Sequence, residues 1–376
     1  MIVCKFGGSS LCDADGFRRV AAIVRANKER KIVVVSAVGK RHSEDEKVTD
    51  MLYRAYRNSE QREMLWQAVC RRYAEIAKDL GVAWVAPPLF CCADGLAAWL
   101  SVGEYCSARL LAAYLSWRFV DAKDLFVFST SGALQEKLTI DRLSGLSKYT
   151  VVPGFYGATM DGTICTFSRG GSDVSAAWIA AVHHADLYEN WTDVDGVLGC
   201  DPRVVRMKPI DQMSYNEAAL MARLGAQVLH PDCILPVERA GVPLWVGNSR
   251  NPNAKGTLIS EKVAMEPMVC GLRDCLWLRH TEIRQIPFDG WMQVGQNYLV
   301  GDGEERVPPT LWGYAEVESG ALLCCLHPSQ LVLDRVQNLC KSLFWIQKGD
   351  TGIAKVSPDE FDIAYLTVAE ACLSLP

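Results

Sequence analysis

The chain of 376 residues is long enough for two or three domains. Its hydrophobic content of 49% with 22% charged residues is typical of a soluble globular protein, and a net charge of −5 without a long basic run argues against nucleic-acid partners. No apolar run approaches the roughly 18 residues of a membrane span, and no signal-peptide pattern precedes the strand expected from residue 2, so we expect a cytoplasmic protein without membrane partners.

From residue 1 to about 260, predicted strands alternate with predicted helices. Continuous apolar runs are typical of strands that are buried on both faces of a parallel sheet. The expected strands are 2–6, 31–36, 125–129, 149–153, 163–167, 186–190 and 243–246. This alternation predicts a three-layer α/β/α domain around a mainly parallel sheet.

Helices are predicted between these strands, at 15–27, 59–81 and 173–182. Two segments, Ser101-x-x-Glu104 and Ser214-x-x-Glu217, have the spacing of a capping box at a helix start. The adjacent histidines 183–184 favour a helix end rather than a pair of metal ligands.

The pattern changes after about residue 262, so we expect two domains, 1–262 and 263–376. The second contains apolar β-like runs at 321–326 and 363–368 and a helical run at 331–343. Together they predict a small α+β module with a β-α-β-β-α-β order.

The fifteen cysteines are expected to be free thiols that pack as small apolar residues in a reducing compartment. No Cys-x-x-Cys spacing occurs, so we expect no metal site. In each of the adjacent pairs 91–92 and 324–325, one member is expected to face the core.

Two junctions of a strand, two glycines and a helix carry the chemistry. Adjacent glycines at 7–8 and 170–171 let the backbone approach a ligand, and a following helix N-terminus favours an anion. Lys5 stands at the first loop, whereas Arg169 and Asp173 flank the second. An arginine fork suits a carboxylate or a phosphate. Neither loop is a Walker P-loop or a dinucleotide fingerprint, and an ordinary strand–turn–helix is the alternative for each.

Several longer strings share one pattern. They are KFGGSS at 5–10, SVGE at 101–104, PGFYG at 153–157, SRGGSD at 168–173, TDVDGV at 192–197, DPR at 201–203 and VLHP at 228–231. Together, and in this order, they resemble the aspartate kinases, whose fold is that of the amino-acid kinases. The strings SAVGKR at 36–41 and KVTD at 47–50 are similar to the clostridial-type branch.

The resemblance implies transfer of the γ-phosphoryl group of MgATP to the β-carboxylate of L-aspartate. The product would be 4-phospho-L-aspartate, made in the first step of lysine, threonine and methionine biosynthesis. Such a reaction depends on placing two repelling anions in line and on cancelling their charge. Mg²⁺ would be held by ATP oxygens and water, because it dehydrates reluctantly.

The resemblance also implies roles for individual residues. Lys5, Arg169 and Asp173 would be catalytic: Lys5 neutralises the phosphates, Arg169 grips a substrate carboxylate, and Asp173 orients the lysine and the substrate. Glu104 would bind the substrate ammonium group. The further substrate-binding residues would be Ser36, Thr49, Gly170 and Ser172. The ATP-binding residues would be Lys5, Gly7, Gly8, Ser9, Thr192, Asp193, Arg203, Gln227 and Val228.

Some of these residues also have a simpler interpretation. Glu104 fits the N3 position of a capping box headed by Ser101. Arg203, after Asp-Pro, could be a surface residue. Asp193 and Asp195 could form a metal-binding pair, but a turn before Gly196 is the favoured interpretation of Asp195. His230 favours a packed or capping residue rather than a base.

Two positions depart from many members of the family. Gln227 stands where many carry a lysine, and Leu198 where many carry a tyrosine. The first change removes a charge near the nucleotide and the second removes a stacking surface. We therefore expect weaker ATP affinity.

The C-terminal region departs further. The family usually ends in two ACT modules that bind lysine or threonine and form the dimer contact, whereas about 110 residues follow residue 262 here. We expect at most one degenerate, ACT-like module, and a homodimer by analogy with the family. Two alternatives stay open: a kinase for an aspartate analogue, and a non-catalytic ligand-sensing subunit on the same fold.

Overall fold

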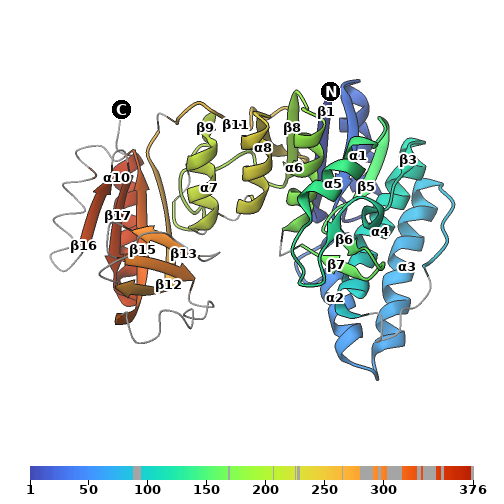
Figure 1. Ribbon diagram of the computed structural model, residues 1–376, viewed down its shortest axis with the longest axis horizontal. Coiled ribbons are helices and arrows are strands. Elements are labelled where there is room, and N and C mark those ends of the chain that lie inside the picture. Colours follow the sequence, from blue (N-terminus) through green and yellow to red (C-terminus); the bar gives the residue numbers. More distant parts are fainter. Residues whose placement is uncertain are drawn as a thin grey trace. The chain divides into compact units, whose positions relative to one another are not determined.

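The structure is a computed structural model, shown in Figure 1. It describes residues 1–87, 95–167, 170–205, 207–224, 226, 229–264, 266–279, 291–294, 298–302, 316–327, 332, 344–348 and 351–373. The chain forms two compact units. The first comprises Met1–Val197, Asp211–Ala218 and Val228–Lys262, and the second comprises Leu198–Ile210, Ala219–Gln227 and Val263–Pro376.

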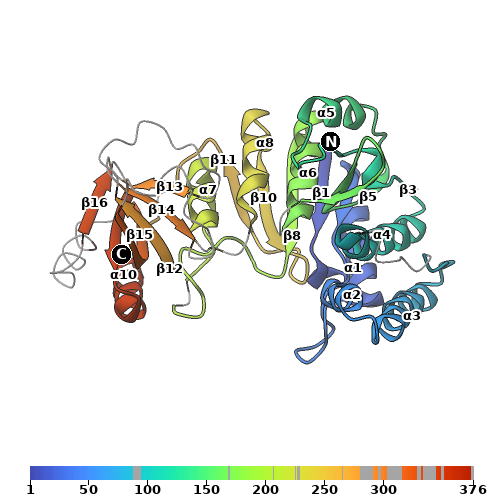
Figure 2. The ribbon, with the colours of Figure 1, turned by 60° about the horizontal axis from the view of Figure 1, so that its bottom comes forward.

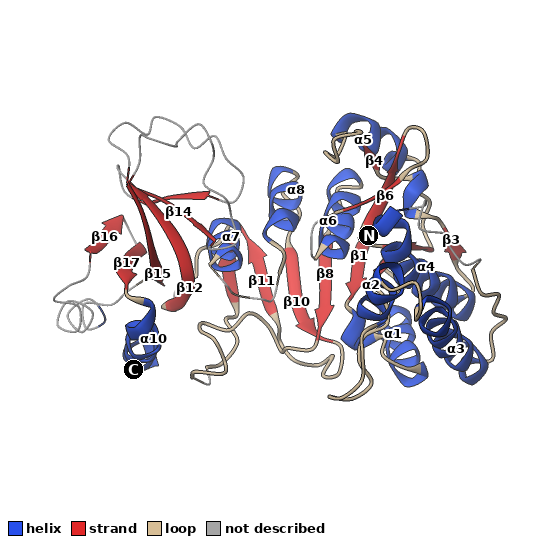
Figure 3. Ribbon diagram, turned by 90° about the horizontal axis from the view of Figure 1, so that it is seen from below, coloured by secondary structure: helices blue, strands red, loops and turns tan. Residues whose placement is uncertain are grey.

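The first unit is organised by a sheet in the order β3-β5-β2-β1-β8-β10-β11-β9. Its strands are β1 (Ile2–Phe6), β2 (Arg30–Val35), β3 (Arg118–Phe119), β5 (Thr150–Pro153), β8 (Leu187–Thr192), β9 (Gln212–Ser214), β10 (Leu244–Asn248) and β11 (Thr257–Ser260). Every neighbouring pair is parallel except β10 with β11. The predicted mainly parallel sheet is confirmed, as Figure 3 shows.

Helices cover both faces of this sheet (Figure 2). On one face, α1 (Ala14–Ala26), α2 (Val48–Arg57), α3 (Arg62–Leu80) and α4 (Gly95–Leu115) share a core with β1 and β2. On the other face, α6 (Gly171–Val182) packs on β1, β2 and β8, and contacts α5 (Glu136–Ser144) and α8 (Ile234–Arg239). A small sheet of β4 (Val127–Phe128), β6 (Tyr156–Thr159) and β7 (Ile164–Thr166) completes the unit.

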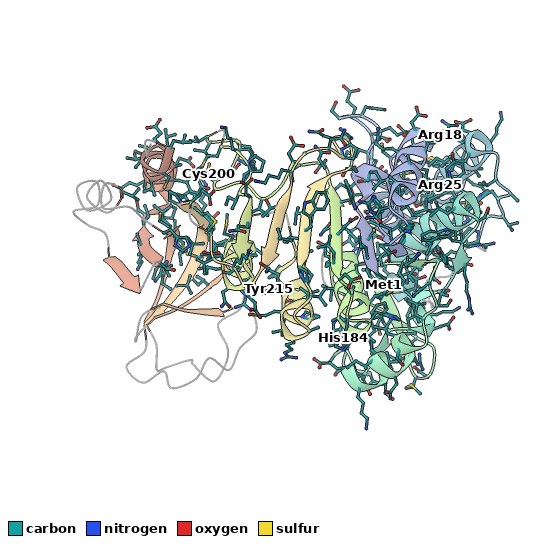
Figure 4. All side chains as sticks on the ribbon, turned by 90° about the horizontal axis from the view of Figure 1, so that it is seen from above. Met1, Arg18, Arg25, His184, Cys200 and Tyr215 are labelled. Carbon is teal, nitrogen blue, oxygen red and sulfur yellow. The ribbon has the colours of Figure 1, made fainter. Side chains whose placement is uncertain are left out.

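The predicted strands of the first unit are all present, with ends shifted by two residues or fewer. The predicted helices correspond to α1, α3 and α6. His183 caps the C-terminus of α6, and His184 follows with a φ of +42°, so the predicted helix end is confirmed (Figure 4).

One predicted capping box is correct and the other is wrong. At the start of α7 (Tyr215–Arg223), the Glu217 carboxylate accepts from the Ser214 amide at 2.7 Å, and the Glu217 amide donates to Ser214 Oγ at 3.2 Å. Ser101 and Glu104 instead lie inside α4, where Ser101 Oγ donates to the Ala98 carbonyl at 2.8 Å. The helix-forming residues that precede Ser101 extend α4 upstream, so neither residue is at its start.

The second unit contains an antiparallel sheet with a helix packed on it. The strand order is β13-β14-β12-β15-β17-β16. The strands are β12 (Met268–Arg279), β13 (Trp291–Val294), β14 (Tyr298–Asp302), β15 (Glu316–Leu326), β16 (Phe344–Lys348) and β17 (Thr351–Val356). The predicted small α+β class is confirmed, but the described residues alone form a sheet of six strands, whereas a β-α-β-β-α-β module has four.

The predicted run 321–326 lies in β15, whereas the β-like run 363–368 is part of α10 (Phe361–Leu373). Residues Phe361, Ala364, Tyr365 and Val368 are buried, at the spacing of a helix face. The strand prediction was wrong because apolar residues also cover the other face of this helix and hide its period. Apart from residue 332, the predicted helix 331–343 lies outside the described residues.

The cysteines that the structure describes are free thiols. Cys324 and Cys325 are both buried, so both faces of β15 are covered at this point, where we expected one. The pair 91–92 lies outside the described residues. Among the helices that are described, none is long and apolar enough to span a membrane.

Candidate functional site

An ion pair between β1 and α6 forms the centre of the candidate site. The Lys5 ammonium nitrogen lies 2.6 Å from Asp173 Oδ1, and the two side chains are only 11% and 9% exposed. Lys5 lies in the middle of the sheet, between partners on β2 and β8. Asp173 lies in the first turn of α6, where the helix dipole favours a negative charge. An unpaired charge this far from water would be costly, so each side chain needs the other as its partner.

The Asp173 carboxylate has further partners that fix its position. Asn190 Nδ2 donates to Oδ1 at 3.1 Å, and the His230 amide donates to Oδ2 at 3.3 Å. Asn190 was missed by the sequence analysis. Its signal was a polar residue at a buried position of β8, next to a second buried polar residue, Glu189.

The first glycine loop follows β1 and includes the 3-10 turn Gly8–Ser10. The Gly7 amide donates to the Trp191 carbonyl at 3.1 Å, and the Gly39 amide donates to the Gly8 carbonyl at 3.0 Å. A Cβ on Gly8 would lie 2.6 Å from the Ala37 carbonyl oxygen. Gly8 is therefore needed for close packing against the loop that follows β2. Ser9 next to it is half-buried.

The second glycine loop leads into α6. Gly170 has a φ of +80°, which favours glycine, and a Cβ there would lie 2.6 Å from the His230 ring. Ser172, in the first turn, is buried. Arg169, the predicted neighbour of Asp173, lies outside the described residues.

His230 occupies a structural position beside this loop. It caps the 3-10 turn Pro231–Cys233, and its Nδ1 accepts from the Asp232 amide at 3.3 Å. The interpretation of His230 as a packed or capping residue is confirmed.

A strained backbone position adjoins the first turn of α6. Phe155 has a φ of +80°, which is unfavourable for a residue with a side chain. Its amide donates to Ser175 Oγ at 3.0 Å, and its carbonyl accepts from the Phe167 amide at 2.8 Å. Strain of this kind concentrates at functional sites, where the surrounding structure maintains it.

Glu104 is a buried carboxylate with an unused acceptor. Its residue is 4% exposed, and its Oε2 atom is buried without a hydrogen-bond partner. Burial raises the pKa of Glu104 to about 8, although hydrogen bonds from the Ala37 and Glu104 amides lower it. A Cβ on Gly103 would lie 2.5 Å from the Ala37 Cβ atom, so the glycine lets this loop approach α4.

The other predicted substrate residues lie at the same edge of the sheet. Ser36 follows the end of β2, and its amide donates to the Phe6 carbonyl at 3.1 Å. Thr49 is half-buried in the first turn of α2. The contacts of Ala37 and Gly39 with Gly8, and of Ala37 with Glu104, bring the first glycine loop, the loop after β2 and α4 together.

Thr192 ends β8, and Asp193 follows it. Thr192 Oγ1 donates to Asp193 Oδ1 at 3.2 Å, and the Thr192 carbonyl accepts from the Ser249 amide at 2.9 Å. Asp195 Oδ1 accepts from Asn248 Nδ2 at 2.8 Å. That contact favours the turn interpretation of Asp195.

Three predicted ATP contacts are not part of this described cluster. Arg203 belongs to the second unit, where its exposed guanidinium lies 2.6 Å from Asp201 Oδ2. Gln227 and Val228 lie outside the described residues. Their contacts with a nucleotide stay predictions.

Comparison with known proteins identifies relatives of the first unit. The model of the amino acid kinase family matches residues 1–248. Aspartokinase 3 of Bacillus subtilis is 37% identical over 290 residues, which cover 70% of this chain and 64% of that protein. The lysine-sensitive aspartokinase 3 of Escherichia coli is 43% identical over 138 residues, which cover 36% and 31%. The chain thus spans less than two thirds of the length of these relatives.

Solved structures have a similar fold. Aspartate kinase of Clostridium acetobutylicum matches with a TM-score of 0.74 and 26% identity, and the match covers both chains completely. Aspartokinase III of E. coli in complex with aspartate and ADP matches with a TM-score of 0.79 and 22% identity, again over both chains. At 22% identity, the second likeness concerns the fold alone.

Gly8→Ala is expected to lower the free energy of unfolding by about 1–3 kcal/mol, because the new methyl group must displace the Ala37 carbonyl. Gly145→Ala is the matched control. Gly145 has a φ of −82°, and a Cβ there makes only ordinary contact. Urea unfolding of both variants checks this, and equal stabilities would contradict the packing role of Gly8.

Glu104→Gln is expected to stabilise the ligand-free protein more at pH 9 than at pH 5. The folded-state pKa of about 8 lies above the ordinary value of 4.5, so the native protein loses stability as the pH rises through this window. Gln cannot ionise and avoids a loss of about 4 kcal/mol between pH 5 and pH 9. Tyr73, Cys106 and Tyr156 sense the Glu104 charge, but their raised pKa values lie above the window.

Denaturant unfolding of the two proteins at pH 5 and pH 9 measures this difference. A stability difference that does not change with pH would contradict the burial of an ionisable, unpaired carboxylate.

Proposed function

The chain belongs to the amino acid kinase family, and we propose that it is an aspartate kinase, which transfers the γ-phosphoryl group of MgATP to the β-carboxylate of L-aspartate. The observation that carries the proposal is the combination of Glu104, buried with a free acceptor, and the Lys5–Asp173 pair beside two glycine loops. The aspartokinase relatives support the same conclusion.

Glu104 explains why the substrate would be an amino acid. A substrate ammonium group would supply the missing partner of Oε2 and would favour the ionised carboxylate, which is disfavoured in the empty site. A dicarboxylate without an ammonium group would leave that oxygen without a partner. A site that must satisfy a buried polar group discriminates strongly against ligands that cannot do so.

The remaining groups would cancel the charge of the phosphates. Lys5 and the amides of Gly8 and Ser9 would contact the phosphate oxygens, whereas the Gly7 amide already donates to the Trp191 carbonyl. Arg169 would grip a substrate carboxylate. Asp173 holds the Lys5 ammonium group in place. No strong general base is needed, because the β-carboxylate of aspartate is ionised at neutral pH. The transfer would rest on placement and electrostatics.

The nucleotide would bind at the carboxyl end of the sheet, together with its metal ion. Thr192 and Asp193 lie at the carboxyl end of β8, the edge where nucleotides bind in open α/β sheets. Arg203, Gln227 and Val228 remain proposed contacts. Asp173 is engaged by Lys5, Asn190 and the His230 amide, so it serves the lysine rather than a metal. Mg²⁺ would be held by ATP oxygens and water, and would supply further charge cancellation there.

We further propose residues 1–262 as the catalytic domain and residues 263–376 as a small regulatory-type module that is ACT-like. A six-stranded antiparallel sheet with α10 packed on it is compatible with such a module. A cytoplasmic homodimer, without nucleic-acid or membrane partners, completes the proposal.

A hydroxylamine trap tests the activity. With MgATP and L-aspartate, the acyl phosphate should be captured as the hydroxamate, whereas succinate, which lacks the ammonium group, should give at least tenfold less. Hydroxamate from another amino acid, but none from L-aspartate, would show that the enzyme is a kinase for that other amino acid. No hydroxamate from any amino acid, together with no MgATP binding by calorimetry, would reject the proposal in favour of a non-catalytic subunit.

Single substitutions should separate the two halves of the site. Lys5→Met is expected to lower kcat by about 10²–10³, because an electrostatic contact to the transferred phosphate is lost. Glu104→Gln is expected to raise the KM for L-aspartate by about 10–100-fold with a smaller effect on kcat. Lys5→Met leaves Asp173 buried without its cation, so Lys5→Met/Asp173→Asn is the folding control. Unchanged Michaelis constants in Glu104→Gln would contradict its assignment.

A further inference from the structure

The β2–α2 loop, residues 36–47, links the end of β2 to the first turn of α2. It carries Ser36 at one end and precedes Thr49 at the other, so its course determines where both hydroxyl groups lie. The loop contains no regular helix or strand that could maintain this course. Its hydrogen bonds to neighbouring elements must do so.

Arg72, on α3, makes the principal contacts to this loop. Its residue is 5% exposed, and its guanidinium donates to the Glu46 carbonyl at 2.9 Å, to Asp45 Oδ2 at 2.8 Å and to the Gly39 carbonyl. One buried fork thus joins both ends of the loop. Asp45 also accepts from the Arg41 amide at 2.9 Å and from its side chain. Hydrogen bonding by Arg41 holds the pKa of Asp45 well below its usual range.

Tyr73, the next residue of α3, connects the same loop to α4. Its hydroxyl group accepts from the Val38 amide at 3.3 Å and donates to the Gly103 carbonyl at 2.7 Å. The residue is fully buried. Val38 and Gly103 are the direct neighbours of Ala37 and Glu104 in the chain. The Tyr73 hydroxyl group therefore lies beside the contact in which the Ala37 amide meets the Glu104 carboxylate.

We propose that Arg72 and Tyr73 are positioning residues of the amino-acid subsite: they hold the β2–α2 loop against α4 so that Ser36, Thr49 and Glu104 converge on one ligand. Neither residue needs to touch the substrate. The assignment of the ligand rests on the proposed function, whereas the clamp itself rests on the contacts alone. Through this clamp, α3 would contribute to substrate selection, although it carries no predicted site residue.

The chemistry of the two side chains suits this task. A guanidinium offers five donors in a rigid fork, so it can hold two carbonyl groups and a carboxylate at once. A phenol donates one hydrogen bond and accepts another, so it can bridge an amide and a carbonyl. Arg72→Lys retains the charge but loses the fork, and Tyr73→Phe retains the ring but loses the bridge. Each substitution tests geometry at nearly constant size.

Amide hydrogen exchange tests the clamp without reference to activity. In Arg72→Lys and in Tyr73→Phe, the peptide that covers residues 36–47 should exchange at least tenfold faster, whereas peptides from the second unit should be unchanged. Asp45→Asn breaks the same contact from the loop side and should accelerate exchange in the same peptide. Because this variant leaves α3 unchanged, its result cannot come from misfolding of α3. Arg71→Met, an exposed neighbour on the same helix, is the control.

Kinetics test what the clamp does for the substrate. Arg72→Lys and Tyr73→Phe should raise the KM for L-aspartate at least tenfold, with the KM for ATP within twofold of wild type. Arg72→Lys combined with Asp45→Asn should be no worse than the more severe single variant, because both open one contact.

The outcomes separate the two proposals. Unchanged exchange in residues 36–47, or equal increases in both Michaelis constants, would overturn the positioning role and leave Arg72 and Tyr73 as general stabilisers. Wild-type protein that forms no hydroxamate would reject the proposed function, and the exchange data would still decide whether the clamp exists.

Discussion

The buried ion pair between Lys5 and Asp173 is the interaction on which the site depends. The Lys5 side chain is only 11% exposed, so its charge requires an anion within hydrogen-bond distance. The first turn of α6 provides that anion, and Asn190 and the His230 amide fix its orientation. The pair thus couples the strand that leads to the first glycine loop with the helix that follows the second.

The packing around this pair explains the choice of small residues. Gly8 and Gly39 let the loops after β1 and β2 touch through their backbones, and Gly103 lets α4 approach the second of these loops. Side chains at these points would push the loop after β1, the loop after β2 and α4 apart. The glycines therefore allow these backbone segments to pack closely, in addition to letting a ligand approach the backbone.

Local pattern was sufficient for β1, β2, β5, β8 and β10 of the main sheet, but it missed the short strands β3, β9 and β11. The predicted strands 125–129 and 163–167 belong to the small three-stranded sheet instead. Local pattern also failed for α10, whose apolar residues surround the helix, and for the start of α4, which depends on residues upstream of Ser101. Glu104 was chosen by resemblance, but its unpaired oxygen is a property of packing. Arg72 and Tyr73 could not be identified from sequence, because their partners lie far away in the chain and are mostly backbone atoms.

The raised pKa of Glu104 also links ligand capture to proton exchange. Near neutral pH, most empty sites hold a neutral carboxylic acid, because the pKa is about 8. Arrival of an ammonium group would expel that proton into the solvent. The heat of association would then vary with the ionisation enthalpy of the buffer, and acidification would weaken capture even though neither partner loses a contact.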